Sequence, residues 1–256
     1  VFSSEGGITL AEPRSEALRT PMFIAMDPPK HDHQRRAVSS IVAPANLANF
    51  EQLIRDRTRA VVEGLPKNET FNFVEKVSIN LTTQMLASLF DFPFEDRHLL
   101  THWSDVAVRP AFTDAELDAR EAEMQECLAY FVRLWNERVN APPKFDLVSM
   151  LAHNDATRNM PPREYLGNLI LLIVGGNDTT RNSMTGSVFH LHNNPGEYDK
   201  LRGDPSLIPS MVSEVIRYQT PLSYMRRRAL ADIVIGGQRI KAGDKVAMWY
   251  ISGNRD

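Results

Sequence analysis

The longest helical pattern in the sequence is interrupted by a run of six residues, GGNDTT at positions 175–180. The pattern opens after Pro161-Pro162 and closes at Asn194-Pro195, and residues 169–174 ahead of the run are all apolar. Inside a helix each glycine costs about 1 kcal/mol relative to alanine, and a carboxyl beside a hydroxyl is out of place on a buried helix. Local rules broken this densely are typical of a functional site. The sequence therefore predicts one long central helix, about 163–194, with a functional site within it.

The run allows two interpretations. Glycine lets another group approach the backbone closely, and a threonine hydroxyl can bond back to a carbonyl one turn earlier and bend or widen the helix. The plainer alternative is a kinked core helix in which Asp178 pairs with an arginine. The run alone does not separate the two.

Composition excludes several classes of protein. The chain has 256 residues, 43% hydrophobic and 24% charged, which suits a soluble globular protein with a sizeable core. The formal net charge is -3 with dispersed basic residues, so no nucleic-acid surface is expected. No apolar stretch is long enough to span a bilayer and no leader pattern opens the chain, which favours a cytoplasmic protein.

The single cysteine, Cys127, excludes an internal disulfide. It lies on an apolar helical stripe with Met124, Phe131 and Leu134, a setting that raises the pKa of a thiol rather than activating it. We interpret Cys127 as a packing residue.

Helical patterns dominate the chain. The expected helices cover residues 28–42, 45–63, 75–90, 95–107, 114–140, 163–194 and 206–219. Strand patterns occur at 70–74, 225–229, 233–235 and 245–251, with Gly236-Gly237 as one of the turns. The expected fold class is therefore mainly α with a small β-sheet region at about 222–251.

A second polar motif is Glu214-Val215-Ile216-Arg217, on the helix that precedes Pro221. The three-residue spacing puts the acid and the guanidinium on one helix face. Because the neighbours are mostly apolar, we expect Glu214 and Arg217 to be a buried pair in which each charge has a partner. The alternative is an ordinary helix ion pair.

Two further motifs carry cations. His31 and Arg35 fall one turn apart after Pro28-Pro29, so the two donors could hold an anionic group, although a solvated helix face is the alternative. His31-Asp32-His33 does not converge on one ion, so no metal site is expected. On the strand at 225–229, alternation separates Arg227 from its two arginine neighbours and predicts Arg227 as an inward-pointing cation, with a plain salt bridge as the alternative.

Taken in order, these four elements resemble the cytochrome P450 superfamily of haem-thiolate monooxygenases, and the resemblance covers essentially the whole chain. It implies the cytochrome P450 fold, with residues 1–256 as the central portion of a single domain. No initiator methionine opens the chain and no tail follows Asp256, so we expect an internal fragment that lacks the N-terminal part and the C-terminal haem-thiolate loop. Cys127 lies in the wrong context to ligate iron, and the fragment itself is expected to be inactive.

The resemblance also implies cofactors and residue roles. The cofactors are haem b, O2 and electrons from NAD(P)H. Asp178 would relay protons inward from solvent, and Thr179 would hydrogen-bond oxygen or a water beside it. Glu214 and Arg217 correspond to the family's buried Glu-x-x-Arg pair. The residues placed around the haem are His31, Arg35 and Arg227 at its propionates and Gly175 and Gly176 over its face.

The substrate pocket should have apolar walls with few polar groups. Its candidate residues, each with core packing as the alternative, are Leu10, Met22, Phe23, Ile24, Leu171, Leu172, Leu222 and Met225. The phrase at 21–29, together with Asn177 and Arg181-Asn182, is similar to bacterial alkane and fatty-acid terminal hydroxylases. That similarity implies oxygen insertion into an unactivated C–H bond at the end of a medium-chain alkane or fatty acid.

Other functions remain open on the sequence. A terpene or sterol hydroxylase would suit the same apolar walls, and a catalytically inactive helical ligand-binding protein would keep the fold. A carboxylate-based hydrolase is disfavoured because no histidine or second carboxyl lies one turn from Asp178. The resemblance implies a separate ferredoxin and ferredoxin reductase as electron donors, with docking expected near Lys30 and Arg36.

Overall fold

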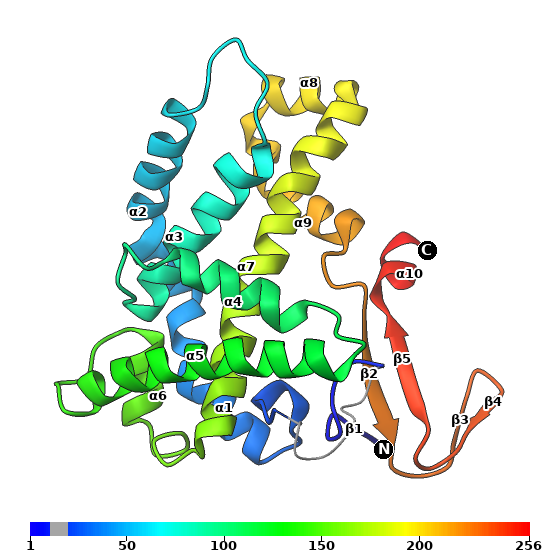
Figure 1. Cartoon of the computed structure of the whole chain (residues 1–256). Helices are drawn as coiled ribbons and strands as arrows, with labels where there is room; N and C mark the ends of the chain where they lie inside the picture. Colours follow the sequence, from blue (N-terminus) through cyan, green and yellow to red (C-terminus); the bar gives the residue numbers. More distant parts are fainter. Residues whose placement is uncertain (11–19) are drawn as a thin grey trace.

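The computed structural model describes residues 1–10 and 20–256, and helices form most of it (Figure 1). Its α-helices are α1 (Lys30–Ser39), α2 (Pro44–Glu63), α3 (Asn80–Phe90), α4 (His98–Val108), α5 (Asp114–Val139), α6 (Leu147–His153), α7 (Pro162–Asn193), α8 (Pro195–Gly203), α9 (Ile208–Gln219) and α10 (Tyr250–Arg255). Short 3-10 helices are η2 (Phe23–Ala25), η3 (Ser40–Val42) and η5 (Pro205–Leu207), and a π-helix, η4, covers Val74–Ile79. The strands are β1 (Phe2–Ser3), β2 (Tyr224–Ala229), β3 (Ile233–Ile235), β4 (Gln238–Ile240) and β5 (Lys245–Trp249).

The long helix α7 runs through the centre of the molecule, and η4, α3, α4, α5 and α9 all pack on it (Figure 1). Pro162 opens it, since proline suits the first helical turn, and it ends just before Pro195. The helix stays α-helical through 175–180, so the widened turn considered from the sequence is absent there. Within residues 1–10 and 20–256, the widened turns lie instead in the π-helix η4, directly before α3.

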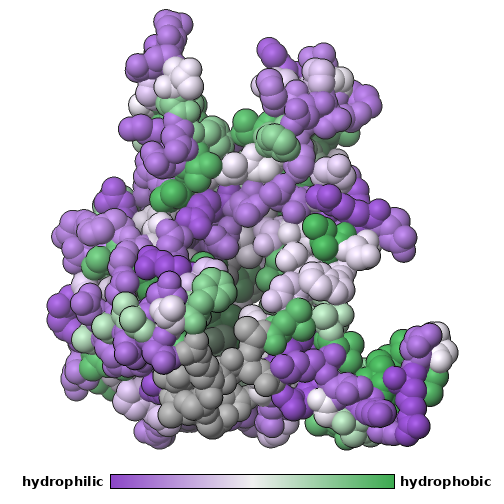
Figure 2. Space-filling view, turned by 45° about the vertical axis from the view of Figure 1, so that its right-hand side comes forward, coloured by the Kyte–Doolittle hydropathy of each residue, from purple (hydrophilic) through white to green (hydrophobic). Residues whose placement is uncertain are grey.

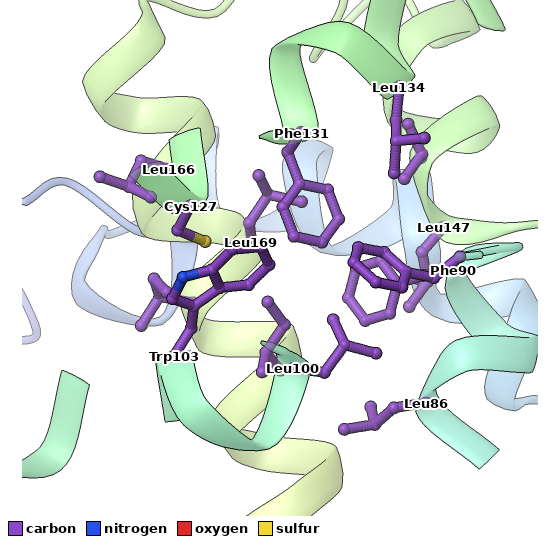
Figure 3. Close-up of a cluster of buried hydrophobic side chains, with 14 of the residues drawn as sticks. Leu86, Phe90, Leu100, Trp103, Cys127, Phe131, Leu134, Leu147, Leu166 and Leu169 are labelled. Atoms are coloured by element: carbon purple, nitrogen blue, oxygen red, sulfur yellow. The ribbon is translucent and has the colours of Figure 1, made fainter. Parts of the chain in front are cut away.

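The main core lies where α3, α4, α5, α6 and α7 meet (Figure 3). Phe90 and Phe131 make an edge contact with ring centroids 5.6 Å apart, and Trp103 packs beside them. Cys127 is fully buried among these side chains, and burial raises the pKa of its thiol well above the usual range. The interpretation of Cys127 as a packing residue is therefore confirmed.

The strands of the described residues form two small antiparallel sheets. In the larger, β2 lies between β1 and β5, with Phe2 opposite Ala229 and Arg226 opposite Ala247. The N-terminal strand thus pairs with the C-terminal part of the chain. In the other, β3 and β4 form a hairpin through Gly236 and Gly237, whose φ angles of 56° and 79° favour glycine.

Some elements differ from the sequence-based expectation. Residues 70–74 form no strand, because the chain there is irregular and then enters helix at Phe73. The last strand ends at Trp249, and 250–255 continue as α10. The short helices α6 and α8 were not expected; α6 is capped by Asp146, which accepts a hydrogen bond from the Ser149 N–H at 2.8 Å. No helix in the described ranges is both long and apolar enough to cross a membrane.

Candidate functional site

One side of α7 is open at the interrupted run. Gly175 is exposed, and a Cβ added there would meet nothing within 4 Å. One turn later, Thr179 Oγ1 donates to the Gly175 carbonyl at 2.8 Å. Thr179 also lines a hollow of about 370 Å³ between α7 and α9, whose walls include Met184, Met211 and Val215. The hydroxyl therefore stands at the edge of a mainly apolar space.

The other side of the run faces α3. A Cβ on Gly176 would lie 2.7 Å from Leu86 Cδ2, and buried Asn177 accepts a hydrogen bond from Thr82 Oγ1 at 2.9 Å. Gly176 therefore allows α3 to pack closely on α7. The expectation that both glycines clear a cofactor face needs correction, because Gly175 alone points to open space.

Asp178 pairs with an arginine, as the plainer interpretation of the run proposed. Arg181 Nη2 donates to Asp178 Oδ1 at 2.5 Å and to Asp105 Oδ1 of α4 at 3.1 Å. Burial disfavours the charged guanidinium, but these two carboxylates outweigh it and raise the pKa of Arg181. The Asp178 carboxyl is half-buried, so the pairing leaves it within reach of solvent.

Two of the expected haem-binding cations meet around Asp27. His31 of α1 donates from Nδ1 to the Phe23 carbonyl at 2.8 Å, since a carbonyl can only accept. Burial alone would raise the pKa of Asp27, but hydrogen bonds from Ser3 and Ser4 and the nearby charges of Arg227 and His31 together hold it below its ordinary value. His31 and Arg227 thus approach one carboxylate from different elements.

Arg35, the third expected cation, lies exposed one turn further along α1. Lys30, at the start of the same helix, donates to Glu164 Oε2 of α7 at 2.7 Å. One of the two residues expected in the docking face on α1, Lys30, therefore forms an ion pair with the central helix.

The buried arginine of β2 is Arg226, not Arg227. Arg226 is 0% exposed; its main-chain N–H donates to the Ile8 carbonyl at 2.8 Å and its Nη2 donates to the Gly6 carbonyl. Arg227 is half-buried and donates from Nη1 to the Arg226 carbonyl at 2.7 Å. The predicted alternation places Arg226 and Arg227 on opposite faces of the strand. The expectation that Arg227 is the inward residue was wrong, because the segment before residue 10 covers the face that carries Arg226.

The Glu214–Arg217 pair is exposed, which corrects the expected burial. Arg217 makes two hydrogen bonds to Glu214, at 2.8 and 2.6 Å, with side chains 45% and 60% exposed respectively. Val212 and Ile216 on the same helix are also exposed. Helix α10 reaches the pair, since Arg217 also donates from Nη1 to the Asn254 carbonyl, but it leaves both charged side chains largely open to solvent.

The candidate substrate residues divide into three groups. Phe23 is buried in the main core, with Leu171 and Leu172 packed partly buried against that core. Met22, Ile24 and Met225 are half-buried, whereas Leu10 and Leu222 are exposed. For Phe23 the core-packing alternative holds. Figure 2 shows one face of the molecule hollowed, with hydrophobic surface inside the hollow.

A buried polar network at the start of α7 was missed from the sequence. Asn168 Oδ1 accepts from the Phe23 N–H at 2.8 Å, and its Nδ2 donates to Gln34 Oε1 at 3.0 Å. Gln34 Nε2 in turn donates to Glu164 Oε1 at 2.5 Å. Glu164 and Asn168, polar residues one turn apart at the start of an apolar helix, were the available signal.

The residues fit a haem in part. Two cationic side chains from separate elements suit its carboxylates, and the open backbone at Gly175 suits a flat group lying against α7. Cys127, the chain's single cysteine, is fully buried in the core, so it does not fit the thiolate ligand.

Comparisons with known proteins show the family. The family model described as Cytochrome P450 matches residues 81–256. The chain is 34% identical to linalool 8-monooxygenase of Pseudomonas putida, over 99% of the chain and 63% of that protein. It is 32% identical to methyl-branched lipid omega-hydroxylase of Mycobacterium bovis, over 100% of the chain and 61% of that protein. The chain therefore spans about three fifths of the length of these curated relatives.

The structural comparison agrees. The solved structure of CYP153D17 from Sphingomonas sp. PAMC 26605 matches with a TM-score of 0.93 and 51% identity, covering 100% of this chain and 65% of that one. Similarity at this level extends over every described element. The chain belongs to the cytochrome P450 family and forms part of its fold.

Proposed function

We propose that the full-length protein containing this chain is a haem-dependent monooxygenase that hydroxylates the end of a medium-chain alkane or fatty acid. The observation that carries the proposal is the open stripe of α7, where Gly175 faces open space and Thr179, one turn later, lines a mainly apolar hollow. The similarity to a CYP153 protein and to a lipid omega-hydroxylase supports attack at a chain end.

In this proposal haem b, with a cysteine of the full-length protein other than Cys127 as its thiolate ligand, would supply the activation of O2 needed to insert oxygen into a C–H bond. His31 and Arg227 hold its carboxylates, and Arg35 adds positive charge one turn along α1. Gly175 keeps the backbone of α7 clear of the bound group. Thr179 offers a hydroxyl proton at the edge of the hollow, and Asp178 passes protons inward from the solvent side.

Electrons come from NAD(P)H through a ferredoxin and a ferredoxin reductase in a cytoplasmic setting. The proposed docking region lies on α1 and consists of Arg36 and Lys30. Arg36 is exposed, and Lys30 is partly exposed while it pairs with Glu164. A salt-dependent rate of haem reduction would support this region, because encounter between charged proteins weakens with ionic strength. A rate that does not change with salt would exclude it.

The test of the proposed function uses the full-length protein. A carbon-monoxide difference spectrum of the reduced protein reports thiolate-ligated haem. Turnover with ferredoxin, reductase and NAD(P)H on a medium-chain alkane and a fatty acid, followed by mass spectrometry, should give the terminal alcohol and the ω-hydroxy acid. Haem binding without any turnover would instead indicate the inactive ligand-binding protein.

A second candidate is hydroxylation of a terpene or sterol. It is favoured by the 34% identity to linalool 8-monooxygenase. Linalool and a sterol belong in the same turnover panel as the alkane and the fatty acid. Product from either of these, with none from the linear substrates, would replace terminal hydroxylation of alkyl chains.

A further inference from the structure

The main chain around Phe23 is held from two sides. Its N–H donates to Asn168 Oδ1 at 2.8 Å, and its carbonyl accepts from His31 Nδ1 at 2.8 Å. Just before it, the Pro21 carbonyl lies against Gly167, where a Cβ would come within 1.9 Å of that oxygen. Gly167 and Asn168 therefore fix the backbone of residues 21–23 on α7.

The side chain of Asn168 is itself oriented by a buried network. Asn168 donates from Nδ2 to Gln34 Oε1 at 3.0 Å, and Gln34 donates to Glu164 Oε1 at 2.5 Å. All three residues are more than nine-tenths buried. Because a buried polar group left without a partner is costly, these hydrogen bonds strongly determine the orientation of the Asn168 amide.

The contact lies on the same stripe of α7 as the candidate chemistry. Asn168, Leu172, Gly175 and Thr179 follow one another at spacings of three and four residues, which places them on one helix face. With a rise of 1.5 Å per residue, Asn168 stands roughly 16 Å from Thr179 along the axis. The Pro21–Phe23 backbone is therefore seated at the far end of the stripe that ends at Thr179.

We propose that Asn168 and Gly167 are positioning residues that fix residues 21–24 as the end wall of the substrate chamber, and thereby set the chain length that the enzyme prefers. The inference rests on the proposed hydroxylase function. Met22 and Ile24, which flank the buried Phe23, are half-buried and supply the wall's side chains. Loss of the Asn168 contact releases the wall, and a longer alkyl chain is then accommodated.

The test uses the full-length haem-loaded protein and the variant Asn168→Ala. Binding of a series of fatty acids of graded length is followed by the substrate-induced shift of the haem absorption band, which needs no turnover. We expect the optimum to move to longer chains. The Kd for the original optimum should rise by up to about tenfold, because binding must then order a wall that one buried hydrogen bond had held in place.

The matched control is Tyr165→Phe. Tyr165 lies one turn before Asn168, is buried, and donates to the Phe131 carbonyl at 3.3 Å, away from residues 21–24. We expect it to lower stability without changing the chain-length profile. Asn168→Ser is made in parallel as a milder change, because its hydroxyl stays in the buried site but is one atom shorter than the amide.

The outcomes separate the two proposals. Suppose that the wild type binds haem and turns over substrate, and that the position-168 variants keep the wild-type dependence of binding on chain length. This result would overturn the end-wall role alone. The same shift in Tyr165→Phe would also overturn it, since the effect would then follow stability. A wild type without thiolate-ligated haem would overturn the proposed function, and the inference with it.

Discussion

The hydroxyl of Thr179 donates to the carbonyl of Gly175 at 2.8 Å, so its proton is directed back into its own helix. To donate toward the hollow, the side chain must give up that hydrogen bond. This hydrogen bond thus holds the Thr179 hydroxyl, the proton donor of the proposed reaction, in one orientation before it donates toward the hollow.

Replacing Thr179 with alanine in the full-length protein should lower the product formed per NAD(P)H consumed by about a hundredfold, the low end of the range for a lost proton-transfer group. Haem content should stay at the wild-type level, because Thr179 is not a haem ligand in the proposal. Parallel assays of product and NAD(P)H consumption provide the measurement. Ser183→Ala is the control, since Ser183 makes the same back-bond, to the Thr179 carbonyl at 2.9 Å. Unchanged coupling in Thr179→Ala would contradict the role.

Asp178→Asn should slow turnover by about a hundredfold while leaving substrate affinity near the wild-type value, because an amide cannot relay protons. Turnover rate and spectral Kd are measured on the same preparation. Asp105→Asn is the companion variant, because it removes the negative charge of the other partner of Arg181 and keeps the Asp178 carboxylate. A weaker Kd with normal turnover in Asp178→Asn would show that Asp178 only shapes the pocket.

The two neighbouring glycines should respond to alanine with opposite sign. Gly175→Ala should raise the free energy of unfolding by about 1 kcal/mol, since its Cβ meets open space and alanine favours helix. Gly176→Ala should lower it by roughly 1–3 kcal/mol, because its Cβ would overlap Leu86 Cδ2 at 2.7 Å in a packed core. Urea unfolding of the haem-free protein measures both, and Gly176→Ala combined with Leu86→Ala tests whether the overlap is the cause.

Asp27 should contribute a pH-dependent part of the stability. Its pKa in the folded protein is held below its ordinary value, so the contribution is present above about pH 4 and is lost as the pH falls through the folded-state pKa. The stability difference between wild type and Asp27→Asn should therefore shrink on going from neutral pH to about pH 3. Urea midpoints at both pH values test this, and a difference that stays constant would show that the Asp27 charge adds nothing.

Local signals predicted the long helix well. Pro161-Pro162 marks the start of α7 and Pro195 follows its end, and the effect of proline on the backbone depends on neighbours in sequence. The apolar stripe around Cys127 was equally readable, because helix periodicity alone puts those residues on one face. The short α6 and α8 were missed because a few residues carry too little periodicity.

Burial of single charged residues was not predictable in the same way. Arg226 is buried because the segment before residue 10 returns over β2, a contact between residues more than two hundred positions apart. The Glu214–Arg217 pair stays largely exposed because its contact from outside α9, a hydrogen bond from Arg217 to the Asn254 carbonyl of α10, does not bury it. The burial of a side chain thus depends on distant parts of the chain. Strand alternation and apolar neighbours are local signals, so they predicted the wrong burial for these residues.

The contact between Gly167 and the Pro21 carbonyl has a practical consequence for engineering. The overlap that a larger residue would create is with main-chain atoms, which cannot rotate away as a side chain can. A mutant library aimed at new substrates should therefore keep Gly167 constant and randomise Met22 and Ile24. The side chains at these two positions can then change in size and polarity while the backbone keeps its position against the central helix.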